Sequence, residues 1–207
     1  MKGKYIVIEG GEGSGKMDQI TLLKDNLIKL DYNVEVVREP GGTERGEIIR
    51  DVLLNPKYEG ELSAEQELLL FMFNRIDLIE RKIKPFVNSG YFVLSDRDVL
   101  SSYAYQGYGG GVSLEDIDGL TRFSLKEFKP DLRFVIDVDA ETGLAMATSD
   151  YKKGDKIGGR NLEYHMRVNE GYRELGGRFP DTIYIPYLKN RAEEMHEIIL
   201  GHVLESL

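Results

Sequence analysis

The chain of 207 residues contains no cysteine and no tryptophan, and it has only six prolines and three histidines. Without cysteine there is neither a disulfide framework nor a thiolate zinc site. His165, His196 and His202 are too scattered along the chain to suggest a metal centre. No apolar run is long enough to cross a bilayer, and the N-terminus lacks the apolar core of a signal peptide. These absences predict a cytoplasmic protein with no membrane partner.

Positive charge is also scarce, because 27 lysines and arginines face 36 acidic residues and leave a net charge of −9. A protein that binds duplex nucleic acid would need a basic face, so this class is not expected. A small anionic substrate remains possible, since a local cluster of cations can oppose the overall sign. The length and a hydrophobic content of 41% predict a single domain over residues 1–207.

One glycine-rich stretch follows the spacing G-x-x-x-x-G-K, between an apolar strand at 5–8 and a helical pattern at 19–30. Glycine lets the backbone wrap around an anion, and the helix N-terminus adds its positive dipole end. The lysine would bridge the outer phosphates of a nucleotide. The competing interpretation is a glycine-rich turn with no ligand. The candidate phosphate-binding residues are Gly10, Gly11, Glu12, Gly13, Ser14, Gly15 and Lys16.

The position after the lysine is unusual. A serine or threonine hydroxyl normally ligates Mg²⁺ there, whereas this chain has Met17 followed by Asp18. A thioether is a poor ligand for a hard cation. The loop therefore predicts phosphate binding more strongly than magnesium-assisted catalysis.

Strands and helices alternate along the rest of the chain, which predicts an α/β fold with a mainly parallel sheet. Ser63 and Gln66 have the spacing of a capping box before a long helix at 63–87, and residues 107–111 form a glycine cluster expected to be flexible. The further strands are expected at 33–37, 91–95, 132–138 and 182–185, and the further helices at 44–54, 99–106, 114–128, 140–148, 162–175 and 191–207.

Polar residues gather where these strands end, and ligands bind at such ends in parallel sheets. The clusters are Arg38-Glu39-Pro40, Asp96-Arg97 and a loop at about 150–160 that carries Lys152, Lys153 and Lys156. Each has a purely structural alternative. The lysines would be a solvated face, the Asp-Arg pair an exposed turn, and Glu39 the end of a strand.

Taken in order, these motifs resemble the thymidylate kinase family. The resemblance rests on Glu9 to Lys16, on Arg38-Glu39-Pro40-Gly41-Gly42-Thr43, on Leu70-Phe71 with Arg75, on Asp96-Arg97, on Ser101 to Gly107, and on Lys129-Pro130-Asp131-Leu132. It implies a P-loop NTPase-type three-layer fold with a lid at about 148–160. It also implies transfer of a phosphoryl group from ATP to dTMP with Mg²⁺, and a homodimer built on the helix at 63–87.

The resemblance also implies roles for individual residues. Lys16, Glu39, Asp96 and Arg97 would form the catalytic centre, with Asp96 organising Mg²⁺ through water. The loop with Met17, Asp18 and the three lysines would hold ATP. Phe71 would stack on thymine, Arg75 and Arg97 would grip the acceptor phosphate, and Glu12 would face the sugar hydroxyl. Arg38, Pro40, Ser102, Tyr105 and Gln106 would complete the substrate pocket. Without this context, Phe71 would be a core residue and Arg75 a member of a solvated helix pair.

The chain departs from the family pattern at several positions. Besides Met17 and Asp18, Asp98 replaces an aromatic or histidine, Arg133 replaces a threonine, and the lid lacks its usual arginine. A catalytic arginine in phosphoryl transfer contributes roughly 10³–10⁵ in rate. Two alternatives therefore stay open, a nucleotide-binding homologue with little or no activity, and a kinase for a related pyrimidine deoxynucleotide.

Overall fold

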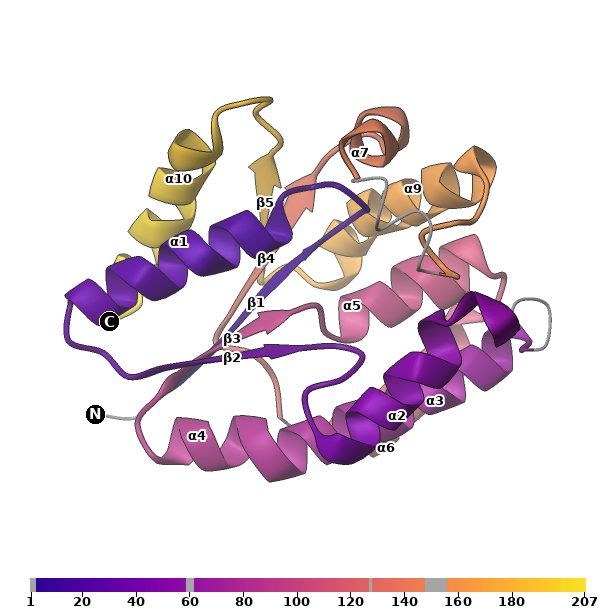
Figure 1. Cartoon of the computed structure of the whole chain (residues 1–207), viewed down its shortest axis with the longest axis horizontal. Helices are drawn as coiled ribbons and strands as arrows, with labels where there is room; N and C mark the ends of the chain where they lie inside the picture. Colours follow the sequence, from indigo (N-terminus) through magenta and orange to yellow (C-terminus); the bar gives the residue numbers. More distant parts are fainter. Residues whose placement is uncertain (1–2, 59–61, 127, 148–155) are drawn as a thin grey trace.

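Five parallel strands form a single sheet in the order β2-β3-β1-β4-β5 (Figure 1). The computed structural model describes residues 3–58, 62–126, 128–147 and 156–207. The strands are β1 (Lys4–Gly10), β2 (Val34–Arg38), β3 (Phe92–Asp96), β4 (Leu132–Asp137) and β5 (Thr182–Pro186). Since every neighbouring pair is parallel, all five carboxyl ends meet at one edge. The predicted α/β class is confirmed.

Helices cover both faces of the sheet and give three layers (Figure 1). On one face, Ile6 and Ile8 of β1 pack in a cluster with Leu23 and Ile199; on the other, Val7 clusters with residues near 78–87. This alternation follows from the two-residue period of a strand. The helices are α1 (Lys16–Lys29), α2 (Glu44–Leu54), η1 (Pro56–Tyr58), α3 (Ala64–Leu78), η2 (Ile79–Ile83), α4 (Lys84–Asn88), α5 (Val99–Ser102), η3 (Tyr103–Gly109), α6 (Leu114–Leu125), α7 (Ala140–Met146), α9 (Leu162–Arg178) and α10 (Ala192–Glu205).

The long helix predicted at 63–87 begins as expected, because Ser63 and Gln66 form both hydrogen bonds of a capping box. It does not continue as one regular α-helix. A π-helical turn, η2, separates α3 from α4, whose second residue is Pro85. Proline has no N–H to donate to the carbonyl four residues earlier, and the wider π turn accommodates this gap.

The glycine cluster at 107–111 differs from the flexible segment expected from the sequence. Gly107 and Gly109 belong to the π-helix η3 and are buried. A Cβ atom on Gly109 would lie 2.6 Å from the ring of Tyr164 and 2.9 Å from Val168. Glycine therefore serves here for close packing of η3 against α9.

Within the described ranges, no helix combines the length and the apolar character needed to cross a membrane.

Candidate active site

The glycine loop after β1 turns tightly before α1 begins at Lys16. Gly10, Gly13 and Gly15 have φ values of 144°, 64° and 84°, a region that side chains rarely adopt. At Gly13 there is also no room, because a Cβ atom would lie 1.9 Å from the carbonyl oxygen of Gly143 in α7. The loop is thus shaped by its glycines and is closed on one side by α7.

Lys16 is buried and folds back over the loop. Its Nζ donates to the carbonyl oxygens of Gly10 at 3.1 Å and Gly11 at 2.9 Å, and lies 3.4 Å from Ser14 Oγ. Burial, with a smaller contribution from Arg97, lowers the pKa of Lys16 to about 8.

A large pocket with about 1130 Å³ of empty space opens beside this loop. Its walls are residues 12–19, Asp96, the end of α7, and the segment after β5 that includes Tyr187, Leu188, Asn190 and Ala192. Met17 and Asp18 line it, as the sequence predicted. The segment after β5 was not predicted, because its residues carry no motif and become neighbours of the loop only through the parallel order of the sheet.

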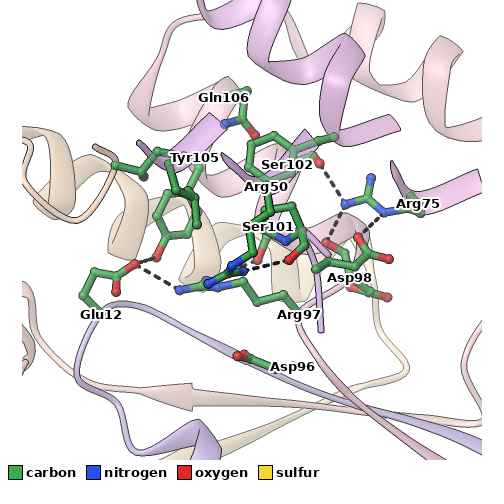
Figure 2. A pocket seen from close by; sticks show the side chains of 15 residues that line it. Glu12, Arg50, Arg75, Asp96, Arg97, Asp98, Ser101, Ser102, Tyr105 and Gln106 are labelled. Carbon is green, nitrogen blue, oxygen red and sulfur yellow. Dashed lines mark hydrogen bonds and ion pairs between the residues drawn. The ribbon is translucent and has the colours of Figure 1, made fainter. Parts of the chain in front are cut away.

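A second pocket lies next to the first, and Glu12 and Asp96 line both (Figure 2). Its empty space of about 540 Å³ includes the open solvent at its mouth. Its lining residues are Glu12, Glu39, Pro40, Arg50, Leu54, Phe71, Arg75, Asp96, Arg97, Asp98, Ser101, Ser102, Tyr105, Gln106 and Ile157. The structure therefore brings together all the predicted substrate residues except Arg38. Two adjacent pockets that meet at a carboxylate can hold a phosphate donor and an acceptor side by side.

Arg97 reaches from the end of β3 across the junction of the two pockets. Its guanidinium donates to Glu12 Oε1 at 3.0 Å and to the Gly10 carbonyl at 3.1 Å, and it lies 4.8 Å from the ring centre of Tyr105. The Tyr105 hydroxyl also donates to Glu12, at 2.7 Å. Burial would raise the pKa of Glu12, but Arg97 and Lys16 outweigh that effect and lower it.

The backbone of Arg97 is strained, with φ at 76°. A non-glycine residue in this region costs about 1–3 kcal/mol and persists only where its surroundings hold it. Here the Arg97 N–H donates to the Ile8 carbonyl at 3.1 Å. In this conformation the Arg97 side chain lines the second pocket.

Glu9, at the end of β1, is fully buried and binds the turn that follows β3. Its Oε1 accepts from the Asp98 and Ser101 N–H groups at 2.7 and 3.0 Å. Its Oε2 accepts from the Ser101 and Tyr172 hydroxyls, both at 2.7 Å. Burial and the nearby Asp98 carboxylate raise the pKa of Glu9 to about 7. The sequence predicted no role for Glu9 itself, which was named only as the first residue of the glycine-loop motif.

Arg75 and Glu39 form a buried ion pair in the wall of the second pocket, with Nε 2.7 Å from Oε2. Arg75 is 1% exposed, and it also donates to Ser102 Oγ and to the Asp98 carbonyl. Burial raises the pKa of Glu39 to about 7, although Arg75 opposes the rise. The donors of Arg75 are thus largely engaged within the protein, so the geometry favours other arginines for a substrate phosphate.

Arg50 of α2 is a further arginine of this pocket, and its role was not predicted from the sequence. It lines the second pocket, and its guanidinium donates to the Pro40 carbonyl at 2.7 Å. In the sequence it looks like an ordinary residue of an amphipathic helix. Arg38, by contrast, turns away: its side chain is 51% exposed and pairs with Glu47 at 2.9 Å. The expectation that Arg38 lines the pocket is wrong in this structure.

Of the three lysines expected to hold ATP, only Lys156 belongs to the described part of the chain. Lys152 and Lys153 lie outside the described residues. Lys156 is buried, with Nζ 3.2 Å from Glu67 of α3, and Arg160 pairs with the same carboxylate at 2.7 Å. Lys156 is absent from the lining of the donor-side pocket. Its predicted contact with ATP stays a prediction, and in this structure Lys156 pairs with Glu67 instead.

Asp96 is the residue that fits a metal ion. It lies at the junction of the pockets, and its buried Oδ1 has no hydrogen-bond partner among the described residues. A carboxylate oxygen suits Mg²⁺, whereas the Met17 thioether does not. No group of three or more acidic, histidine or cysteine side chains in the described parts of the chain could hold a metal by itself. Mg²⁺ would therefore share Asp96 with substrate phosphates and water.

The glycine loop lies between a strand and a helix, which is the arrangement of a P-loop protein. The second pocket lies beside it, with Asp96 and Arg97 between the two, so the site has room for two phosphorylated ligands. The sequence profile of thymidylate kinase matches residues 8–199, and the chain belongs to the thymidylate kinase family. The resemblance inferred from the motifs is confirmed. The members of this family are nucleoside monophosphate kinases, so membership does not favour the alternative of a non-catalytic nucleotide-binding protein.

Individual relatives match over nearly their full lengths. The thymidylate kinase of Legionella pneumophila (strain Corby) is 40% identical over 99% of this chain and 95% of the relative. That of Caldanaerobacter subterraneus subsp. tengcongensis is 36% identical over 100% and 98%. The crystal structure of thymidylate kinase from Ehrlichia chaffeensis matches with a TM-score of 0.80 and 29% identity, covering 99% of this chain and 100% of that one.

The lowered pKa of Lys16 gives a first prediction. The cation is lost above pH about 8 in the free protein, so the Kd for ATP should rise, by up to tenfold per pH unit, from that point. Titration calorimetry between pH 7 and 9.5 measures it. Lys16→Arg is the control, since a guanidinium stays charged throughout this range. A parent Kd that stays constant to pH 9.5 would contradict the assignment.

Proposed function

We propose that this chain transfers the γ-phosphoryl group of ATP to dTMP and forms dTDP and ADP. The observation that carries the proposal is the pair of adjacent pockets that share Glu12 and Asp96. The donor lies in the pocket of the glycine loop, and the acceptor lies in the pocket lined by Phe71 and Gln106. A cytoplasmic location remains a prediction.

Transfer is direct, without a covalent enzyme intermediate, and the protein supplies position and charge. Lys16 exchanges the Gly10 and Gly11 carbonyls for the outer phosphates of ATP. Arg97, at the junction of the pockets, neutralises the transferred group, and Arg50 holds the acceptor phosphate. When bound, Mg²⁺ neutralises charge on the donor phosphates, with Asp96 as its protein partner, directly or through water.

The acceptor pocket has features that suit a pyrimidine deoxynucleotide. Phe71 offers an aromatic face for stacking. The buried Nε2 of Gln106 has no hydrogen-bond partner among the described residues and can donate to a base edge. Glu12 and Tyr105 face the sugar, while Pro40 and Ser102 complete the wall. Arg75 fixes Glu39 and Ser102 in this arrangement.

The domain organisation belongs to the same proposal. We expect residues 1–207 to form one domain with a lid at about 148–160. Residues 148–155 of that segment lie outside the described residues. Lys156 and Ile157 follow directly after them, and Ile157 lines the acceptor pocket. The position of Ile157 supports a lid that reaches the acceptor pocket.

A coupled ADP-release assay with ATP, Mg²⁺ and dTMP tests the function. We expect turnover of roughly 1–100 s⁻¹, the ordinary range for kinases. A double variant, Met17→Ser with Asp18→Thr, should turn over faster, because it restores a hydroxyl ligand for Mg²⁺. Faster turnover with dUMP or dCMP than with dTMP would identify a kinase for another pyrimidine deoxynucleotide. Absence of ADP release with any acceptor would contradict the proposal.

The second pocket gives a prediction for Arg50. Arg50→Ala should raise the KM for dTMP at least tenfold, because it removes a cation from the acceptor wall, and change the KM for ATP less than threefold. The matched control is Arg45→Ala on the same helix, since Arg45 is exposed and pairs with Asp77 at 3.2 Å. Equal effects of the two substitutions would show that Arg50 does not bind the acceptor.

We also propose a homodimer that uses α3 and α6. Leu69 and Phe73 of α3 are 56% and 49% exposed, and Phe123 of α6 is 77% exposed. Large exposed apolar side chains on neighbouring helices are typical of an interface. Sedimentation should show a dimer at micromolar concentration, and Phe123→Ser should shift it toward monomer. The control Met166→Ser, at an exposed residue of α9, should leave the dimer unchanged. A monomeric parent protein would contradict the proposed dimer.

A further inference from the structure

An ion pair lies buried behind the acceptor pocket and joins the turn after β3 to β4, the strand on the other side of β1. Arg133 Nε and Nη2 lie 3.0 and 2.5 Å from Asp98 Oδ2, and the two side chains are 9% and 5% exposed. The other carboxylate oxygen, Oδ1, accepts from the Leu100 N–H at 3.0 Å and caps α5. The Arg133 guanidinium lies 5.5 Å from the ring centre of Phe179. Both charges are therefore fixed in position.

The backbone of Asp98 joins two parts of the active site. Its N–H donates to Glu9 at 2.7 Å, and its carbonyl accepts from Arg75 Nη2 at 3.0 Å. Glu9 binds Ser101, and Arg75 binds Glu39. A displacement of Asp98 would thus disturb both walls of the acceptor pocket.

Asp98 also follows the strained residue Arg97, whose φ is 76°. Such a conformation persists only when the surrounding structure holds it in place. The bond from the Arg97 N–H to the Ile8 carbonyl holds one side. The side chain of Asp98, bound to Arg133 and to the Leu100 N–H, holds the other.

We propose that Asp98 and Arg133 are a positioning pair that keeps Arg97 and the Glu39–Arg75 ion pair in the geometry that binds the acceptor nucleotide. The inference rests on the proposed function, because it assigns the second pocket to the acceptor. Arg133 does not line either pocket, and it acts only through Asp98.

The electrostatics of the site agree with this role. Burial would raise the pKa of Asp98, but Arg133 outweighs burial and lowers it, so the carboxyl stays charged. Asp98 in turn raises the pKa of both Glu9 and Glu39. Without Arg133, the three buried acids Glu9, Glu39 and Asp98 would have less positive charge nearby to compensate them.

Three variants test the pair by initial-rate kinetics. Arg133→Gln leaves Asp98 unpaired, and Asp98→Asn keeps an oxygen to cap α5 but leaves Arg133 unpaired. We expect each to raise the KM for dTMP at least tenfold while the KM for ATP changes less than threefold. The double variant replaces two charges by a hydrogen-bonded amide pair and should return the KM for dTMP to within about threefold of the parent.

The matched control is Arg173→Gln, which removes a more exposed ion pair between α9 and Asp137 of β4 and should leave both KM values unchanged. Thermal melting of all variants shows whether they are folded at the assay temperature. Single variants with a lower Tm and an unchanged KM for dTMP would show a merely structural pair and overturn the inference. A double variant whose KM for dTMP is as high as that of the single variants would also overturn the inference.

The failure of the proposed function would look different. It would appear as a parent protein without dTMP-dependent ADP release. In that case the Kd for dTMP, measured by calorimetry on the same variants, replaces the KM. Single variants that bind dTMP as tightly as the parent would overturn the positioning role, and at least tenfold weaker binding with recovery in the double variant would support it. A parent that binds no dTMP would overturn both proposals.

Discussion

The active site depends on the hydrogen bonds made by the buried carboxylate of Glu9. It accepts four hydrogen bonds, from the Asp98 and Ser101 N–H groups and from the Ser101 and Tyr172 hydroxyls. These donors come from the turn after β3, from α5 and from α9. A carboxylate without partners would be very costly in this interior, so the three segments are held together at the carboxyl ends of β1 and β3.

Several buried charges then have to balance one another around Glu9. Burial raises the pKa of Glu9 and Glu39 to about 7, whereas Arg97 and Arg75 oppose the rise. A buried ion pair contributes little net stability, but removal of one partner is costly. The arrangement therefore favours one geometry of the pocket walls over others. One of these cations, Arg97, also lines the pocket in which a substrate phosphate would lie.

The sequence allowed the sheet, the glycine loop and most of the second pocket to be predicted, because these follow from local periodicity and from motifs at strand ends. Long-range electrostatic pairing was not predictable. Arg50 looks like a surface residue, and Lys156 looks solvated although Glu67 buries it. Asp98 and Arg133 are 35 positions apart, and neither departure from the family pattern indicates its partner. Only the parallel order of β3, β1 and β4 brings such side chains together.

Lys16 shows how this network prepares the protein for a ligand. In the structure its ammonium group is already buried, with the Gly10 and Gly11 carbonyls in place of water. Much of its desolvation cost is therefore met during folding rather than during binding. A nucleotide phosphate has only to replace neutral carbonyl oxygens by charged ones, which strengthens each hydrogen bond. Since Arg97 also donates to the Gly10 carbonyl, the loop stays tied to the acceptor pocket while this exchange takes place.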